Sequence, residues 1–178
     1  MHIELNLTYE DFVAMYELER QYYDEEFITP IKESYEWYLN RPHSYRVAKQ
    51  DNKVVGFMCL FPISKHLASD ILSGAYSDVS MTYQDILELS NLEMNEPNTL
   101  FLSCIVVERE YRQFKVSRML VSSYCDLYAD FYCGDVLCDN VTEDGVRFSQ
   151  KLGMSKVCDS HHQSIIMCGT FETLQKLY

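Results

Sequence analysis

The sequence has no long apolar run, and it has little glycine, proline and basic charge. No stretch of about 18 uninterrupted apolar residues occurs, which excludes a membrane-spanning helix of the usual kind. The first residues, MHIELNLTYEDF, lack the basic segment and apolar run of a signal peptide. The 6 glycines and 4 prolines form no linker or low-complexity stretch. We therefore expect one globular domain over residues 1–178, located in the cytoplasm and without a membrane partner.

The 7 cysteines are an odd number and include no CxxC pair. Several lie within apolar runs such as FMCL and IIMC, where a thiol behaves as a small hydrophobic group. Without an export signal, we expect reduced and mostly buried thiols. Cys133, Cys138, Cys158, His161 and His162 can be assembled into a metal site on paper, but their spacing matches no zinc pattern. We expect no metal.

Basic residues are scarce, since 15 Lys and Arg stand against 27 Asp and Glu, for a net charge of −12. This balance argues against a nucleic-acid partner, because neutralising phosphates requires a basic surface. The acidic residues gather in residues 1–40, with ten, and in residues 66–108, with seven and no Lys or Arg. Four basic residues then fall within ten positions: Arg109, Arg112, Lys115 and Arg118. Such an isolated basic cluster suggests an anion site.

Apolar periodicity predicts a mixed α/β chain in the order β-α-α-β-β, insert, β-α-β-α-β-β. The expected strands are 3–7, 44–50, 53–61, 99–107, 135–140, 154–158 and 163–171. The expected helices are 8–27 with Thr8 as N-cap, 31–40, a short helix from Thr82, 116–132 stopped by Gly134, and 143–152 ended by Gly153. We expect one mixed sheet with helices on both faces. The strand 99–107 is apolar on both faces and should be central.

The junction IVVEREYRQFKVSRML (105–120) takes this central strand into a helix. The first N–H groups of a helix have no partner within it, and the helix dipole places partial positive charge there. A pyrophosphate could be bound by the backbone amides of residues 113–118, with the basic side chains around it. The charge pattern alone fits a solvated helix start, offset by Glu108 and Glu110, equally well.

The stretch VVEREYRQFKVSRMLV resembles the coenzyme A-binding motif of the GNAT superfamily, in which a strand precedes Q/R-x-x-G-x-G/A and a helix. Arg112 fills the first motif position, while Lys115 and Ser117 stand at the Gly and Gly/Ala positions. Downstream, DNVTEDGVRFSQKLGM resembles the second signature of the family, an Asn after a strand and a helix ending in Y-x-K-x-G-F. The matching residues there are Asn140, Lys151 and Gly153. The element order also fits, so the resemblance covers nearly the full length.

The resemblance implies a GNAT-type central sheet and acetyl-CoA as co-substrate. It implies that the strand 100–107 splays from its neighbour and that pantetheine lies in the gap, bonding the strand backbone. The implied coenzyme A-binding residues are Ile105, Val106, Val107, Arg112, Gln113, Phe114, Lys115, Val116, Ser117, Arg118 and Asn140. The implied reaction is the attack of a neutral amine on the thioester carbonyl. A strand N–H stabilises the oxyanion, and a donor protonates the leaving thiolate.

The sequence departs from the family pattern in two ways. Both motif glycines are absent, and Lys115 and Ser117 are tolerated there if they have helical dihedral angles. The thiolate-protonating tyrosine of the family aligns with Ser149, the candidate catalytic residue. An alkyl hydroxyl is a much poorer proton donor than a phenol of pKa about 10. Ser149 therefore either positions a water or is an ordinary helix-surface serine, with solvent as the proton source.

No general base can be named from the sequence, because Glu108 and Glu110 lie beside the pyrophosphate loop. In this family the residues around 8–40 and 63–98 form the acceptor wall, and here both stretches are acidic. This favours a cationic acceptor, although the acids can equally face solvent. The acceptor-side candidates are Tyr35, Tyr38, Asp78 and Tyr83, and for the aromatic ones core packing is the preferred interpretation.

We therefore expect an N-acetyltransferase that acts on a primary amine of a small molecule or peptide. One alternative is a catalytically silent GNAT-fold module that binds coenzyme A or a protein partner. A nucleotide-binding protein of another fold is disfavoured, because no G-x-G-x-x-G or Walker pattern occurs. The oligomeric state stays open, with a homodimer among the alternatives.

Overall fold

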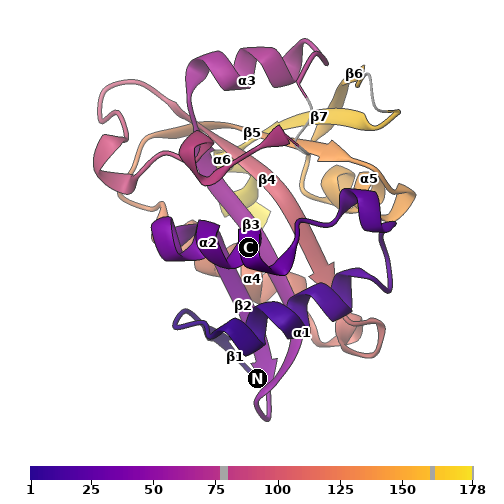
Figure 1. The fold of residues 1–178 in the computed structure, drawn as a ribbon. Coiled ribbons are helices and arrows are strands. Elements are labelled where there is room, and N and C mark those ends of the chain that lie inside the picture. Colours follow the sequence, from indigo (N-terminus) through magenta and orange to yellow (C-terminus); the bar gives the residue numbers. More distant parts are fainter. Residues whose placement is uncertain (77–79, 161–162, 178) are drawn as a thin grey trace.

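Seven strands form one sheet in the order β1-β2-β3-β4-β5-β7-β6 (Figure 1). The computed structural model describes residues 1–76, 80–160 and 163–177. The strands are β1 (His2–Glu4), β2 (Tyr45–Gln50), β3 (Lys53–Ile63), β4 (Asn98–Val107), β5 (Cys133–Asn140), β6 (Ser155–Asp159) and β7 (Ile165–Thr170). β4 and β5 form the one parallel pair among these strands. β4 is fourth of seven, which confirms the prediction of a central strand.

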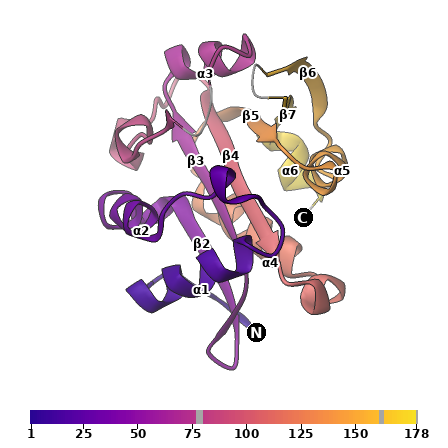
Figure 2. The same ribbon diagram turned by 45° about the vertical axis from the view of Figure 1, so that its right-hand side comes forward.

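Helices cover both faces of this sheet, as expected (Figures 1 and 2). The α-helices are α1 (Tyr9–Glu19), α2 (Ile31–Asn40), α3 (Lys65–Leu72), α4 (Val116–Leu127), α5 (Glu143–Lys151) and α6 (Phe171–Leu177). One core packs α1, α2 and α3 against sheet residues such as Phe57 and Phe101. The other packs α4 and α6 against residues such as Met58 and Leu100. Neighbouring residues of a strand thus enter opposite cores, as the alternation of side chains in a strand requires.

Local sequence signals define several of these elements as predicted. The Thr8 side chain accepts from the Asp11 N–H, and the Asp11 carboxylate accepts from the Thr8 N–H, which completes a capping box at the start of α1. Asp51 and Asn52 have φ of 50° and 65°, so the β2–β3 turn uses two left-handed residues, as tight hairpins prefer. Gly153 has φ of 79° and ends α5.

The first helix is shorter than predicted. α1 ends at Glu19 rather than near Phe27, and the residues after it include only the short 3₁₀ helix η1 (Glu25–Phe27). The tyrosines beyond α1 contact β4 and the turn after it: Tyr22 Oη accepts from the Arg109 N–H at 3.0 Å. Contacts with the sheet have replaced continuation of the helix. The first strand is also shorter, since β1 ends at Glu4 rather than residue 7.

The insert between β3 and β4 differs most from the prediction. Ser64 caps an unexpected helix, α3, whose Leu67, Ala68 and Ile71 are buried. The helix expected from Thr82 is a single 3₁₀ turn, η4 (Tyr83–Asp85), after which Ile86 bridges to Ile63 at the end of β3. Pairing with the sheet thus ends the helix after its first turn.

Three elements in the second half of the chain, α4, β5 and α6, differ from the prediction. α4 ends at Leu127 instead of residue 132, and β5 begins at Cys133. Gly134 is therefore part of a strand rather than a helix stop, and a Cβ there would lie 2.7 Å from Pro97 Cβ. α6, which follows β7 directly, was not predicted. Its Phe171 and Leu174 are buried in the core that contains α4.

Within residues 1–76, 80–160 and 163–177, no helix combines the length and apolar character needed to cross a membrane. No group of three or more His, Cys, Asp or Glu side chains in those ranges could hold a metal ion, and His161 and His162 lie outside them. The 7 cysteines all lie inside and none forms a disulfide, but only Cys59 and Cys138 are fully buried. The expectation of mostly buried thiols is therefore wrong.

Candidate active site

The central strands separate part-way along their length. β4 and β5 are paired from Asn98 and Cys133 as far as Leu102 and Cys138, and no pairing continues beyond. The rest of β4 runs on beside β3 alone, from Cys104 to Val107, toward the turn before α4 (Figure 2). The expected splay is present. A register shift between Cys59 and Leu60 on β3 leaves Ser103 as an extra residue on β4, and such a bulge bends a strand.

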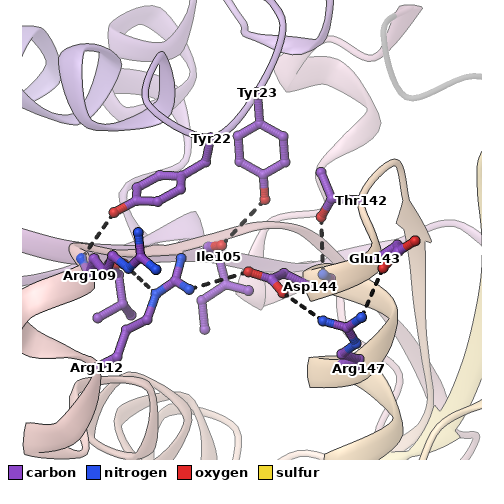
Figure 3. Close-up of polar contacts among 11 residues, drawn as sticks. Tyr22, Tyr23, Ile105, Arg109, Arg112, Thr142, Glu143, Asp144 and Arg147 are labelled. Carbon is purple, nitrogen blue, oxygen red and sulfur yellow. Dashed lines mark hydrogen bonds and ion pairs between the residues drawn. The ribbon is translucent and has the colours of Figure 1, made fainter.

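One cavity, which we call the helix-end cavity, opens where the splayed part of β4 faces the beginnings of α4 and α5. Its volume is about 690 Å³. Its lining residues are Tyr22, Tyr23, Ile105, Val106, Val107, Arg112, Ser117, Thr142, Glu143, Asp144, Gly145, Arg147, Phe148 and Lys151. Thr142 caps α5 by accepting from the Gly145 N–H at 3.0 Å (Figure 3). Two helix starts and three basic side chains therefore face one space.

Only some of the residues predicted to bind coenzyme A line this cavity. Ile105, Val106, Val107, Arg112 and Ser117 do so. The side chains of Gln113, Phe114, Lys115 and Arg118 are exposed beside it, and Val116 is fully buried in the core under α4. Asn140 lies on the other side of the splay. For residues 113, 114 and 116 the backbone, rather than the side chain, is what the start of α4 can offer to an anion, whereas exposed Lys115 also adds a positive charge beside it.

Arg112 is held against the cavity wall (Figure 3). Its Nε donates to Val107 O at 3.2 Å, and its guanidinium carbon lies 5.0 Å from the centre of the Tyr22 ring. Its Nη1 lies 3.3 Å from Asp144 Oδ2 at the start of α5. Arg112 thus bridges the splay between β4 and α5, because its partners come from both sides.

Lys115 differs from the sequence-based expectation. It has φ of 60° and ψ of 29°, the left-handed conformation, at the N-cap of α4. The hypothesis that helical dihedral angles make glycine dispensable is therefore wrong for Lys115, although Ser117 does lie within α4. A non-glycine residue in this conformation is strained by about 1 kcal/mol or more. No side-chain hydrogen bond from the N-cap residue closes the start of α4, and the first N–H groups of a helix have no acceptor within it.

A second cavity, which we call the carboxylate cavity, lies on the α1–α2 side of the splay. Its volume is about 320 Å³. Its acidic lining residues are Glu19, Glu26, Glu33 and Asp139, and its described lining residues include no Lys, Arg or His. Of the second acidic stretch, 63–98, the described lining residues include only Met81. The negative charge therefore comes from α1, α2, the loop between them and β5.

The two cavities meet at the splay. The residues that line both are Tyr23, Ile105, Thr142, Gly145 and Phe148. A molecule lying in the helix-end cavity along β4 can thus reach the carboxylate cavity at Ile105 without crossing the sheet.

Glu19, one of the carboxylates that line the carboxylate cavity, has a strongly raised pKa. Its Oε1 accepts from Cys104 Sγ at 3.2 Å, and burial raises its pKa from 4.5 to about 7, against a smaller lowering by that hydrogen bond. Sequence reasoning missed Glu19. The signal was present, since Phe12, Met15 and Glu19 follow helical spacings of three and four and place a carboxylate on the apolar stripe of α1.

Tyr23, one helical turn beyond Glu19, was also missed. Its hydroxyl donates to Ile105 O at 3.5 Å, at the point where the cavities join (Figure 3). Burial raises the pKa of this phenol far above its usual value, and the nearby Cys104 and Glu19 add to the effect. The phenol therefore stays protonated.

Ser149 is buried, with 1% of its surface exposed. Its hydroxyl donates to Asn140 Oδ1 at 3.1 Å and lies 3.3 Å from Cys138 Sγ, while Asn140 Nδ2 donates to that sulfur at 3.1 Å. These three side chains form a closed network at the end of the paired part of β5. The interpretation of Ser149 as a helix-surface serine is therefore wrong.

The remaining acceptor-side candidates take structural positions. Tyr35 and Tyr38 pack against Phe12, and Tyr38 Oη donates to Leu5 O at 3.0 Å. Tyr83 lies under the Arg41 guanidinium. Core packing is thus the correct interpretation for Tyr35 and Tyr38. Asp78 lies outside the described residues.

Residues 12–154 match the model of the Acetyltransferase (GNAT) family. A comparison with curated protein sequences gives no match.

Several solved structures share the fold at low identity. Ard1 from Thermoplasma volcanium is 16% identical, with a TM-score of 0.61 and coverage of 94% of this chain and 95% of that one. Naa20 from Chaetomium thermophilum, in complex with a bisubstrate analogue, is 14% identical, with a TM-score of 0.62 and coverage of 99% and 90%. The GNAT-like decarboxylase GphF, in complex with isobutyryl-CoA, is 12% identical, with a TM-score of 0.68 and coverage of 96% and 99%.

Proposed function

The chain belongs to the Acetyltransferase (GNAT) family, and on that premise we propose that it transfers an acetyl group from acetyl-CoA to a primary amine that is cationic in solution. The observation that carries this proposal is the meeting of the two cavities at the splay of β4 and β5. One cavity has helix starts and basic side chains, which suit a pyrophosphate. The other has four carboxylates, which suit an ammonium group.

The helix-end cavity fits coenzyme A by the chemistry of its wall. The uncapped start of α4 supplies N–H groups to a phosphate, and the positive charges of Arg112, Arg147 and Lys151 outnumber the negative charges of Glu143 and Asp144 in the same wall. Beyond Leu102, β5 no longer pairs with β4, so the backbone of Ile105–Val107 can pair with the amide groups of pantetheine where Tyr23 and Arg112 release the carbonyls that they contact. When bound, acetyl-CoA supplies the electrophilic acetyl carbon.

Glu19 is the residue we assign as the general base. A cationic amine must lose a proton before its nitrogen can attack, and a base works best when its pKa lies near the operating pH. The raised pKa of about 7 meets this condition, and Glu19 lies in the wall of the carboxylate cavity beside Cys104 of β4. Because Glu19 must be ionised to accept the proton, activity should rise as the pH passes upward through about 7.

A panel of amines tests the proposed function. Thiol release from acetyl-CoA should be fast with polyamines, amino sugars or lysine side chains and slow with free glutamate, because the carboxylate cavity repels an anionic acceptor. For the best amine, kcat/KM should fall with added salt while kcat changes little. Binding of coenzyme A, with no thiol released from acetyl-CoA in the presence of any amine, would identify a silent module instead. Efficient acetylation of glutamate would refute the cationic acceptor.

A further inference from the structure

The second family signature leaves α5 without a phenol. Ser149 stands at the tyrosine position, and its hydroxyl proton is directed to Asn140 Oδ1. Cys138 Sγ occupies the other side of the same hydroxyl. Both neighbours belong to β5 and hold the Ser149 hydroxyl within the wall of the carboxylate cavity, and an alkyl hydroxyl is a poor proton donor to a thiolate.

A phenol reaches the same region from the opposite wall. Tyr23 lies in the loop after α1, and its hydroxyl contacts Ile105 O, which is 82 positions away in sequence. Tyr23 lines both cavities, so its hydroxyl lies where the acyl donor and the amine must meet. The 3.5 Å separation from Ile105 O is long for a hydrogen bond, so little is lost when the hydroxyl turns to another acceptor.

The charged and titratable groups around Tyr23 are on four elements. They are Glu19 at the end of α1, Cys104 on β4, Arg112 in the turn before α4 and Asp144 at the start of α5. Burial of Tyr23 disfavours a phenolate most strongly, Cys104, Glu19 and Asp144 add to this effect, and Arg112 favours the phenolate. The phenol can therefore release its proton only if it regains one at once.

We propose that Tyr23 is the proton donor to the leaving sulfur, in place of the tyrosine missing from α5. The inference rests on the proposed acetyl transfer, with Glu19 as base. Glu19 first accepts one proton from the ammonium group and later releases it to solvent. As the carbon–nitrogen bond forms and the carbon–sulfur bond breaks, Tyr23 gives its phenolic proton to the sulfur. It regains a proton from the nitrogen, which becomes the amide, so Tyr23 ends the cycle unchanged.

The test compares Tyr23→Phe with Tyr16→Phe, a matched control in α1 whose exposed hydroxyl donates to Glu25. The first readout is binding, by calorimetry, of coenzyme A and of desulfo-coenzyme A, which lacks the thiol. A hydrogen bond to the thiolate lowers the pKa of the bound thiol. The preference for coenzyme A, meaning its affinity divided by that of desulfo-coenzyme A, should then grow about tenfold between about pH 7 and about pH 9.5 in the wild type. In Tyr23→Phe the preference should change less than about twofold over this range.

The second readout is kinetic. Tyr23→Phe should lower kcat at least about tenfold, with little change in the KM for the amine, while Tyr16→Phe behaves as the wild type. If Tyr23→Phe loses the pH-dependent preference but the wild type acetylates no amine, the Tyr23–sulfur contact stands and the proposed transfer is refuted. Unchanged kcat in Tyr23→Phe, or a lowered kcat with an unchanged preference, would overturn the assignment of Tyr23 and leave the transfer standing.

Discussion

Replacing Glu19 by Gln should stabilise the protein at neutral and higher pH. The folded state raises the pKa of Glu19 from 4.5 to about 7 by burial. The folded state therefore holds a proton that the unfolded state has already released, and stability falls as the pH rises from 4.5 to about 7. Above about pH 7 the Glu19 carboxylate is ionised in both the folded and the unfolded state, and the loss of stability is complete. Gln has nearly the same shape and no charge, so the variant lacks this pH dependence.

The magnitude follows from the same pKa shift. The difference between about 7 and 4.5 is about 2.5 units. At about 1.36 kcal/mol per unit this gives roughly 3 kcal/mol. Because Glu19 also borders a cavity, water there reduces the figure, and we expect about 1–3 kcal/mol. The Cys104 thiol keeps a hydrogen-bond acceptor in the Gln side chain.

Urea unfolding measures this difference. The quantity compared is the free energy of unfolding of Glu19→Gln minus that of the wild type, at about pH 8 and at about pH 5. This difference should be larger at pH 8 by about 1–3 kcal/mol. Glu17→Gln, on the exposed side of α1, is the control and should show a difference near zero at both pH values. An equal effect of Glu19→Gln at both pH values would refute the reasoning, because it would mean that the Glu19 pKa is not raised by folding.

Three further predictions concern the start of α4 and the network around Ser149. Combined Arg112→Glu and Lys115→Glu should weaken coenzyme A binding at least about tenfold and reduce its salt dependence, by calorimetry; unchanged affinity in the folded variant would place the site elsewhere. Lys115→Gly should raise the free energy of unfolding by about 1 kcal/mol, because φ is 60° there, and a decrease would show that the left-handed conformation is not strained. Ser149→Ala should cost about 1 kcal/mol of stability, since Asn140 loses a donor, while kcat stays within about twofold; a large loss of kcat would make Ser149 a direct participant.

Local signals in the sequence were sufficient for much of the fold. The Thr8–Asp11 cap, the Asp51–Asn52 turn and the apolar strand 99–107 each depend on residues close together in the chain. Their physical causes are short-range hydrogen bonds, left-handed turn residues and side-chain alternation, which a sequence displays directly. The motif resemblance added the splay, and the end of pairing at Leu102 confirmed it.

The chemistry of the site was decided only by the tertiary structure. Glu19 meets Cys104 and Tyr23 meets Ile105 across 85 and 82 positions of the chain, and burial at these contacts raises both pKa values. The orientation of Ser149 likewise depends on Cys138 and Asn140 of a neighbouring strand. A pKa and a hydrogen-bond direction depend on what surrounds a group in space, and the neighbours in sequence supply little of that surrounding.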